Sequence, residues 1–338
     1  MHRQSFAKLK NIVSNFNHAK ILVIGDLILD EFIWGTVSRI SPEAPVPVVW
    51  AKSESFMPGG ACNVANNIVS LGGKAYLAGT IGDDEHGAIL KGEIESKGID
   101  TSAIIMDANR QTTLKTRVVA HHQQVVRIDK ETVEPLKEEI ILKMAGCIRD
   151  LIKDSDAVII EDYGKGVITP RLLKSVVPLA KRMKKVVAVD PKEEHFSYYR
   201  GVSLITPNTQ EAQKASGLEI RDESSLFKAG QRILDRIGCG IALVTLGESG
   251  MCVFKRGARP KHIQTIAQEV FDVSGAGDTV IAVYTLSLIS GADPIQAAHI
   301  ANCAAGIVVG KVGTATVAPE ELIEKIQLEI NKFKSKER

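Results

Sequence analysis

The pattern that most limits the fold of this chain is a repeated alternation of short apolar runs with longer amphipathic segments. The runs are rich in Val and Ile and apolar at successive residues, which predicts strands buried on both faces. They cover residues 21–25, 76–81, 157–161, 186–190, 202–206 and 241–246. Helical spacing predicts helices over 138–152, 171–183, 224–237, 278–289 and 294–309. The alternation predicts an α/β fold with a mostly parallel sheet, helices on both faces, and ligands at the carboxyl ends of the strands.

Two segments, 32–50 and 112–129, depart from this alternation. Both contain clusters of valine and isoleucine, and the first is interrupted by prolines, which suit edge strands. We interpret them as a small β-rich lid outside the main sheet, with surface loops as the alternative. An exposed lid of this kind suits pairing between two subunits, so we expect a homodimer formed through it.

The remaining chain shows no internal domain boundary and no repeat. Residues 1–19 have apolar side chains at helical spacing and are expected to form a packing helix ahead of the main domain. We assign 20–330 to one large α/β domain and 331–338 to a charged tail.

Composition limits the class of protein. The chain is 24% charged and 44% hydrophobic with a net charge of +2, and it has no block of like charges, so neither nucleic acid nor a membrane surface is an expected partner. The five cysteines are odd in number and far apart, which argues against a disulfide framework or a zinc site. Together with the lack of a signal-peptide pattern or a long apolar run, this predicts a cytoplasmic protein.

The strongest chemical signal is the run Ser274-Gly275-Ala276-Gly277-Asp278, which opens an apolar helix. Small residues let a ligand approach the backbone closely, and the first amides of a helix have no internal partner, so such a start binds phosphate readily. A carboxylate placed there can accept a proton from an alcohol during phosphoryl transfer. The alternative is that Asp278 only caps the helix.

A second set of candidates suits a polyhydroxylated ligand, because glycines permit close approach and carboxylates and amides bond to hydroxyls. These candidates are Gly59, Gly60 and Asn63 at the start of a helix, and Gly25, Asp26 and Asp30 after the first strand. An ordinary loop entering a helix, or a capped turn, remains the alternative for each group.

Two further runs follow strands. Asn208 and Glu211 share a helical face and suit a hydrated Mg²⁺, although a capping box explains the same spacing and both can hold at once. The run from Thr245 to Gly250 suits the edge of a nucleotide site, and a tight hairpin explains it equally well.

Taken together, these motifs resemble those of the ribokinase-like (PfkB) carbohydrate kinases over nearly the whole chain. The Gly59-Gly60 run with Asn63 is similar to the first signature of that family. The run 272–278 is similar to its second signature, D-T-x-G-A-G-D, and departs from it only by Val273. Asn208 and Glu211 match its N-x-x-E motif, and the three motifs occur in the expected order.

The resemblance implies a three-layer α/β/α fold and transfer of the γ-phosphoryl group of ATP to a sugar hydroxyl, with Mg²⁺. Asp278 would be the base, and the amides of Gly275, Ala276 and Gly277 would form the anion hole. The implied nucleotide residues are Asn208, Thr209, Gln210, Glu211, Thr245, Gly247, Gly250 and, more weakly, Asn302. Family members often bind a monovalent cation such as K⁺, which here would involve Asp272 and the loop 308–313.

Two more runs, 39–48 and 162–166, resemble members of the family that act on D-glycero-β-D-manno-heptose 7-phosphate. This implies phosphorylation of the anomeric hydroxyl to give the 1,7-bisphosphate, for the synthesis of ADP-heptose and lipopolysaccharide core. Some of those kinases are fused to a nucleotidyltransferase, and the resemblance here is to the stand-alone form. The phosphate already on the sugar needs cations, for which Arg117, Arg127, Lys165 and Lys192 are the candidates.

Two rival hypotheses remain. One is another kinase of the same family that acts on a different sugar or sugar phosphate. The other is a non-catalytic protein that senses sugar or nucleotide on the same fold. The presence of Asp278 together with Asn208 and Glu211 argues against a non-catalytic protein.

Overall fold

The computed structural model describes residues 4–121, 123–266 and 270–336. Its main sheet runs in the order β13-β12-β11-β10-β9-β8-β1-β4-β5. The strands from β11 to β5 are parallel, while β12 and β13 are antiparallel at one edge. The strands are β1 (Lys20–Gly25), β4 (Lys74–Gly82), β5 (Asp100–Asp107), β8 (Ala157–Glu161), β9 (Val186–Asp190), β10 (Leu204–Ile205), β11 (Ile241–Thr245), β12 (Met251–Lys255) and β13 (Lys261–Ile263).

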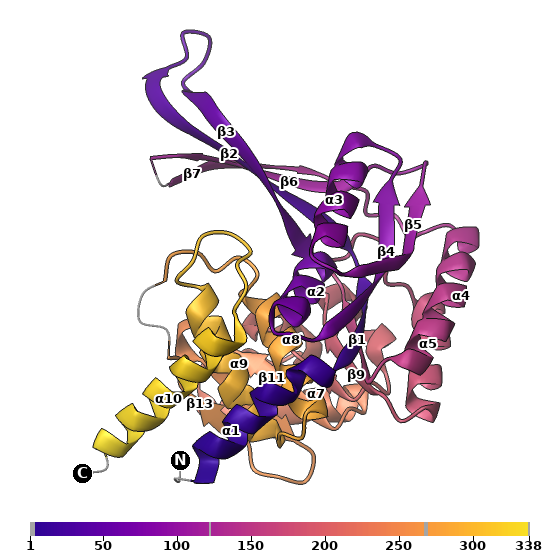
Figure 1. Cartoon of the computed structure of the whole chain (residues 1–338), viewed down its shortest axis with the longest axis vertical. Helices are drawn as coiled ribbons and strands as arrows, with labels where there is room; N and C mark the ends of the chain where they lie inside the picture. The colour runs from indigo at the N-terminus through magenta and orange to yellow at the C-terminus, as the bar shows by residue number, and fades with distance from the viewer. Residues whose placement is uncertain (1–3, 122, 267–269, 337–338) are drawn as a thin grey trace.

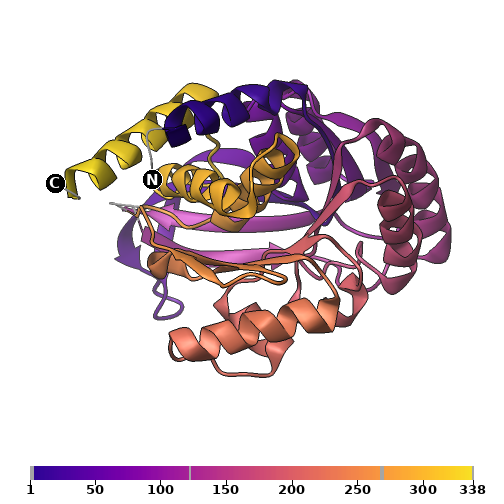
Figure 2. The same cartoon turned by 90° about the horizontal axis from the view of Figure 1, so that it is seen from below.

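Helices cover both faces of this sheet, so the strands are buried on both sides as their composition predicts (Figures 1 and 2). One hydrophobic core joins the sheet to α1 (Gln4–Ser14), α2 (Ala61–Ser70), α3 (Glu85–Ser96), α8 (Ala276–Ile289), α9 (Pro294–Val308) and α10 (Pro319–Lys336). The second core joins it to α4 (Glu138–Asp154), α5 (Pro170–Arg182), α6 (Thr209–Ser216) and α7 (Glu223–Ile237). None of the described helices is long and apolar enough to cross a lipid bilayer.

A second sheet projects from the body of the molecule and forms the lid (Figure 1). Its order is β3-β2-β6-β7, with β2 (Leu27–Ile40), β3 (Pro47–Gly60), β6 (Thr113–Ala120) and β7 (Gln123–Lys130). The β-rich lid expected from 32–50 and 112–129 is confirmed, and its first two strands reach further toward the core than predicted. Those inner residues, such as Ile28 and Leu29, are buried.

The predicted strands match the structure closely except at 202–206, where β10 keeps only two residues. The ends of the chain also pack as helices: α1 contacts α10, and Leu9 and Phe16 are buried there. Helix α10 continues through Lys336, so residues 331–336 extend that helix, and 337–338 lie outside the described residues.

Candidate active site

The carboxyl ends of three neighbouring strands bring two acidic residues together. In the registers of β1, β8 and β9, Gly25 lies beside Glu161, and Glu161 lies beside Asp190. A Cβ atom on Gly25 would lie 2.2 Å from the carbonyl oxygen of Glu161, so the strands can approach here only because residue 25 is glycine. This edge is where a doubly wound sheet binds its ligands.

Helix α8 begins directly at this edge and packs against β8 and β9. Its N-cap is Gly275, which has φ 74°, and Asp278 is the third residue of the helix. Asp278 is therefore not the N-cap that was the alternative interpretation of this residue. Its side chain instead turns inward and is buried.

The carboxylate of Asp278 is held at both oxygens. Asn63 Nδ2 donates to Oδ2 at 2.7 Å, and the Tyr163 hydroxyl donates to Oδ1 at 2.9 Å. Burial raises the pKa of Asp278 to about 6, and the charge of Asp30 adds to this, while the bonds from Asn63 and Tyr163 oppose it. A carboxyl group with this pKa is ionised at neutral pH and is also a better proton acceptor than an ordinary aspartate.

Asn63 is itself fixed by a buried polar chain that starts on α8. Thr279 donates to Asn67 Oδ1 at 3.0 Å, and Asn67 Nδ2 donates to the backbone oxygen of Asn63 at 2.9 Å. Asn63, which was predicted to bind sugar, thus contacts the Asp278 carboxylate in this structure.

Glu161 and Asp190 form a carboxylate trio with Asp278. One oxygen atom of each lies within 4.8 Å of the others. Glu161 Oε2 is buried without a hydrogen-bond partner among the described residues. Burial raises the pKa values of Glu161 and Asp190 well above their ordinary range. The charges of Asp190 and Asp278 add to this at Glu161, and those of Glu211 and Asp278 add to it at Asp190. Clustered carboxylate oxygens with an unsatisfied atom are the hard ligand set that suits Mg²⁺, so the residues fit such an ion.

The sequence interpretation missed Glu161 and Asp190. Each is the last residue of a buried Val- and Ile-rich strand, at the edge where ligands were expected. An acidic residue at the carboxyl end of a buried strand was the pattern in the sequence that could have identified Glu161 and Asp190. Tyr163, which contacts the base, carried no such signal.

The predicted Mg²⁺ residues Asn208 and Glu211 form a complete capping box at the start of α6. Asn208 Oδ1 accepts from the Glu211 amide at 3.0 Å, and Glu211 Oε2 accepts from the Asn208 amide at 2.8 Å. Glu211 is also near enough to Asp190 to raise the pKa of that residue. The capping interpretation is therefore confirmed. The capping box also holds Glu211 near the carboxylate trio of Glu161, Asp190 and Asp278.

The other predicted nucleotide residues lie along the same edge. Asn208 bridges to Thr245, and Thr209 Oγ1 donates to the Thr245 carbonyl at 3.3 Å. Gln210 is exposed on α6. Residues Gly247 and Gly250 form the tight turn into β12 that was the alternative interpretation, and a Cβ on Gly250 would lie 2.1 Å from the Ile263 carbonyl oxygen.

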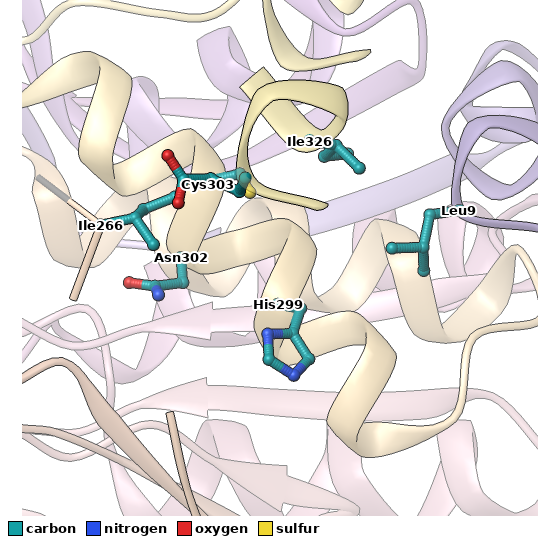
Figure 3. Close-up of a pocket in the computed structure, with 7 residues that line it drawn as sticks. Leu9, Ile266, His299, Asn302, Cys303 and Ile326 are labelled. Atoms are coloured by element: carbon teal, nitrogen blue, oxygen red, sulfur yellow. The ribbon is translucent and has the colours of Figure 1, made fainter. Parts of the chain in front are cut away.

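Asn302 lies on α9, where its Nδ2 donates to the Gln264 carbonyl at 2.8 Å. It lines a small pocket between α1, α9 and α10 (Figure 3). The lining residues are Leu9, Ile266, His299, Asn302, Cys303, Ile326 and Glu329. None of the residues around Asp278 lines this pocket, so it does not mark the reacting groups.

The predicted anion hole needs one correction. The Ala276 amide already donates to the Val273 carbonyl at 3.2 Å, in the turn that leads into α8. Among the described residues, the amides of Gly275 and Gly277 have no protein acceptor, and Gly277 is exposed. Of the three amides predicted for the anion hole, those of the two glycines are thus free to bind a ligand in this structure and that of Ala276 is not.

Asp26 was predicted to bind sugar, but the structure gives its carboxylate three backbone partners. The amides of Tyr163, Lys165 and Val167 donate to it at 2.9, 3.0 and 3.1 Å. Burial, with repulsion from Asp162, raises the pKa of Asp26 to about 6. Asp26 therefore fixes the loop that carries Tyr163 against the base.

The remaining predicted sugar residues lie where β2 and β3 leave the core. A Cβ on Gly59 would lie 2.4 Å from Asp30 Oδ2, and Gly60 has φ 56° at the start of α2. Asp30 is buried and forms an ion pair with Arg117 at 2.6 Å. These residues enclose the side of Asp278 that faces the lid.

The four predicted phosphate residues do not form one group. Arg117 lies opposite Arg127 on the paired strands β6 and β7, and Lys165 reaches the lid through Glu131. Lys192 follows β9 instead, packs beside Gly164 and pairs with Glu194 at 3.8 Å. Lys192 thus pairs outside the lid, although it packs beside the residue next to Lys165.

Asp272 bonds to both segments proposed for a monovalent cation. Its carboxylate accepts from the Ser274 amide at 2.9 Å and from the Gly313 amide at 3.0 Å. Burial opposes the charge of Asp272, but these amide bonds outweigh it and lower its pKa. The Val309 carbonyl accepts from the Asp272 amide at 3.2 Å, so the two loops are adjacent as expected.

Comparison with known proteins decides the family. A sequence model of the pfkB family of carbohydrate kinases matches residues 18–321. The chain belongs to this family. The resemblance drawn from the glycine-rich and N-x-x-E motifs is thereby confirmed.

Close relatives of this kinase chain are longer proteins. The Bifunctional protein HldE of Geobacter metallireducens is 48% identical over 317 residues, which cover 93% of this chain and 65% of that protein. The Bifunctional protein HldE of Helicobacter hepaticus is 44% identical over 307 residues, which cover 91% of this chain and 64% of that protein. The chain spans about two thirds of the length of these relatives.

Solved structures confirm the ribokinase-like fold of this kinase. Ribokinase of Arabidopsis thaliana, complexed with ribose and ATP, superposes with a TM-score of 0.72 at 18% identity, covering 91% of this chain and 98% of that chain. Phosphofructokinase-2 of Escherichia coli, in complex with potassium, superposes with a TM-score of 0.76 at 18% identity, covering 92% and 99%. At this identity the likeness shows the fold alone.

Proposed function

We propose that this chain transfers the γ-phosphoryl group of ATP to the anomeric hydroxyl of D-glycero-β-D-manno-heptose 7-phosphate. The observation that carries the proposal is the buried carboxylate of Asp278 beside the free amides of Gly275 and Gly277. A proton acceptor and an anion-binding helix start then lie at one point, as phosphoryl transfer to an alcohol requires.

In this proposal Asp278 Oδ1 or Oδ2 takes the proton of the sugar hydroxyl as the new P–O bond forms. The bond between the γ-phosphorus and the β–γ bridging oxygen of ATP breaks, and ADP leaves with that oxygen. Asn63 and Tyr163 keep the carboxylate in place, so little reorganisation is needed when the reaction starts. The amides of Gly275 and Gly277 bond to the equatorial oxygens of the migrating group, where negative charge is spread.

Mg²⁺ would be held by Glu161 and Asp190, with Glu211 beside them, and would neutralise charge on the ATP phosphates. The nucleotide would lie along Asn208, Thr209, Thr245 and Gly247, with Gln210, Gly250 and Asn302 as outer candidates. Asp272 and the loop 308–313 remain the proposed position of a monovalent cation such as K⁺.

The heptose assignment is supported by the runs 39–48 and 162–166 and by the relatives named above. The second of these runs supplies Tyr163 to the base and Lys165 to the lid. Substrate choice is therefore proposed to depend on a loop that also orders the reacting carboxylate.

A screen of sugar phosphates with ATP and Mg²⁺, read as ADP release, tests this function. Heptose 7-phosphate should be turned over well ahead of fructose 1-phosphate and of unphosphorylated sugars. A clear preference for another sugar would assign the chain to another member of the family. No sugar-dependent ADP release with any candidate would support a sensor and reject the kinase.

We also propose that two copies pair through the lid and that the enzyme works in the cytoplasm. The lid exposes Ile40, Val46 and Trp50, the last with 74% of its surface accessible, and β3 and β7 are unpaired edges of its sheet. All five cysteines are free thiols, four of them buried, which suits a reducing compartment.

A further inference from the structure

The root of the lid carries charges that the chemistry at Asp278 does not use. We call Lys115, Arg117, Asp129, Glu131 and Lys165 the lid-root cluster. Lys165 Nζ lies 2.6 Å from Glu131, and Lys115 Nζ lies 3.9 Å from Glu131 and 3.4 Å from Asp129. The side chains of the cluster are only 12% to 25% exposed. The cluster is thus a semi-buried network that joins the end of β7 to the loop after β8.

Glu131 is the least satisfied member of the cluster. Its Oε1 accepts from Lys165, but its Oε2 is buried without a hydrogen-bond partner among the described residues. A carboxylate in this state has lost water at one oxygen without a full replacement, which costs free energy. Lys165 and Lys115 can therefore exchange Glu131 for an anion with more hydrogen-bond acceptors at little cost in free energy.

Lys165, the lysine partner of Glu131, lies close in the chain to the residue that contacts Asp278. Lys165 is two residues from Tyr163, whose hydroxyl contacts Asp278, and the Lys165 amide is fixed by Asp26. Lys165 lines a small polar hollow with Thr80, Arg110 and Thr113 among its walls. From the other direction, Arg117 reaches Asp30, which is near enough to Asp278 to raise its pKa.

We propose that Glu131 occupies, in the free protein, the place of a phosphomonoester that the sugar substrate already carries. The incoming phosphate displaces Glu131 and takes Lys165 and Lys115 as its partners. This rests on the proposed kinase function and assigns the substrate class as phosphorylated sugars. A phosphate brings up to two charges and three acceptor oxygens, so it satisfies two lysines better than one carboxylate does.

A sugar without the phosphate cannot displace Glu131, since its hydroxyl groups do not compete with an ion pair. The cluster therefore acts as a specificity filter, in which Glu131 competes only with the phosphate of a ligand and is displaced only by a dianion. Lys165 and Lys115 are positioned before the substrate arrives, which reduces the entropy lost on binding.

The test compares Glu131→Gln and Lys165→Gln by their KM values for a sugar phosphate and for the same sugar without phosphate. Glu131→Gln should lower KM for the phosphorylated sugar roughly fivefold, because the competing carboxylate is gone. Lys165→Gln should raise that KM roughly tenfold or more. Neither change should shift KM for the unphosphorylated sugar by more than about twofold. Glu54→Gln on β3 is the matched control, since Glu54 is an exposed lid carboxylate with no ion pair among the described residues.

Inorganic phosphate is the second probe, as a competitive inhibitor against the sugar phosphate. It should inhibit Glu131→Gln at a lower concentration than the parent, and the gain should disappear in the double variant with Lys165→Gln. Thermal denaturation of each variant confirms folding. If Glu131→Gln leaves KM and phosphate inhibition at parent values while the parent phosphorylates heptose 7-phosphate, this inference is overturned and the proposed function stands. If the parent prefers an unphosphorylated sugar, the heptose assignment falls as well, and the kinase assignment stands.

Discussion

At the scale of single residues, Asp278 shows a conflict between reactivity and stability. Burial makes its carboxylate a stronger base, and the same burial makes the ionised form costly in the folded state. Asn63 and Tyr163 offset part of this cost with one hydrogen bond at each oxygen. Reacting groups of enzymes are commonly held in such costly states.

Replacing the base should therefore stabilise the protein while it removes activity. The folded pKa of Asp278 is about 6 against an ordinary 3.8, so the cost of the ionised form is fully present above pH 6. It is lost as the pH falls through 6 toward 4, where both the folded and unfolded states bind the proton. Without Mg²⁺, Asp278→Asn should thus raise the free energy of unfolding at pH 8 by on the order of 2 kcal/mol. The Tyr163 hydroxyl can turn to accept from the new amide.

Thermal denaturation of the parent and Asp278→Asn between pH 4 and pH 8 checks this expectation. The gain in stability should shrink steadily toward pH 4, and turnover at pH 8 should be lower by roughly 10²-fold to 10⁴-fold. Turnover near the parent value would reject Asp278 as the base. A stability gain that does not depend on pH would reject the raised pKa.

A substitution of Glu161 tests the proposed Mg²⁺ site. Glu161→Gln keeps the shape of the side chain and removes a charge from the trio, so the Mg²⁺ concentration for half-maximal activity should rise roughly tenfold. Titration of Mn²⁺ by electron paramagnetic resonance with ATP present should show the same loss of affinity. Glu219→Gln, which changes an exposed glutamate paired with Arg221, is the charge control. Unchanged ion affinity in Glu161→Gln would remove Glu161 from the ligand set.

At the scale of elements, the glycines at the two ends of α8 share a positive φ but differ in their surroundings. Gly275 at its start and Gly291 just past its end both have positive φ, 74° and 95°. A Cβ on Gly275 would lie 2.4 Å from Asn63 Nδ2, whereas a Cβ on Gly291 would meet nothing within 4 Å. A side chain at either position would therefore be strained by the positive φ. Only a side chain at Gly275 would also contact Asn63, which bonds to Asp278.

This difference predicts the effects of two alanine substitutions. Each should cost about 1 kcal/mol in the free energy of unfolding, since alanine is strained at positive φ. Gly275→Ala should in addition displace Asn63 from Asp278 and lower turnover by about tenfold or more, because small misplacement of reacting groups is costly. Gly291→Ala should keep parent turnover. Equal turnover in the two variants, measured as ADP release, would show that the start of α8 does not depend on Asn63.

At the scale of the whole molecule, the lid is proposed both to bind substrate at its base and to form the interface between two subunits. The lid projects from the body of the molecule (Figure 1). Asp30 and Glu131 form ion pairs near its base, and Ile40, Val46 and Trp50 are exposed on it. Two strand edges and the exposed Trp50 are available to a second copy. A dimer formed there would hold the lid over the active site.

The dimer proposal predicts that Trp50→Glu yields a monomer. A charge in the centre of an apolar interface costs several kcal/mol, enough to separate subunits at micromolar concentration. Light scattering coupled to size-exclusion chromatography measures the mass. Leu142→Glu is the control, because Leu142 is similarly exposed at 56% but lies on α4, away from the lid. A parent protein that is monomeric at high concentration would contradict the proposal.

The sequence by itself determined the layers of this protein and the place of its chemistry. Runs such as 157–161 are apolar at every position but the last, and a strand of that kind can only lie inside a sheet covered on both faces. The run 274–278 combines glycines with a carboxylate at a helix start, so its anion-binding character is a local property of the backbone. Both follow from interactions between residues that are near one another in the sequence.

Tertiary structure alone decided which side chains meet. Asp278 is 215 residues from Asn63 and 115 from Tyr163, and no local pattern reports such contacts. Strand register set Glu161 beside Asp190, and the packing of α8 brought Asp278 to both. The loop after β8 turned Asp26 from an expected sugar ligand into an anchor for backbone amides. Periodicity and turn chemistry are local, whereas a charge acquires its role from the partners that long-range packing provides.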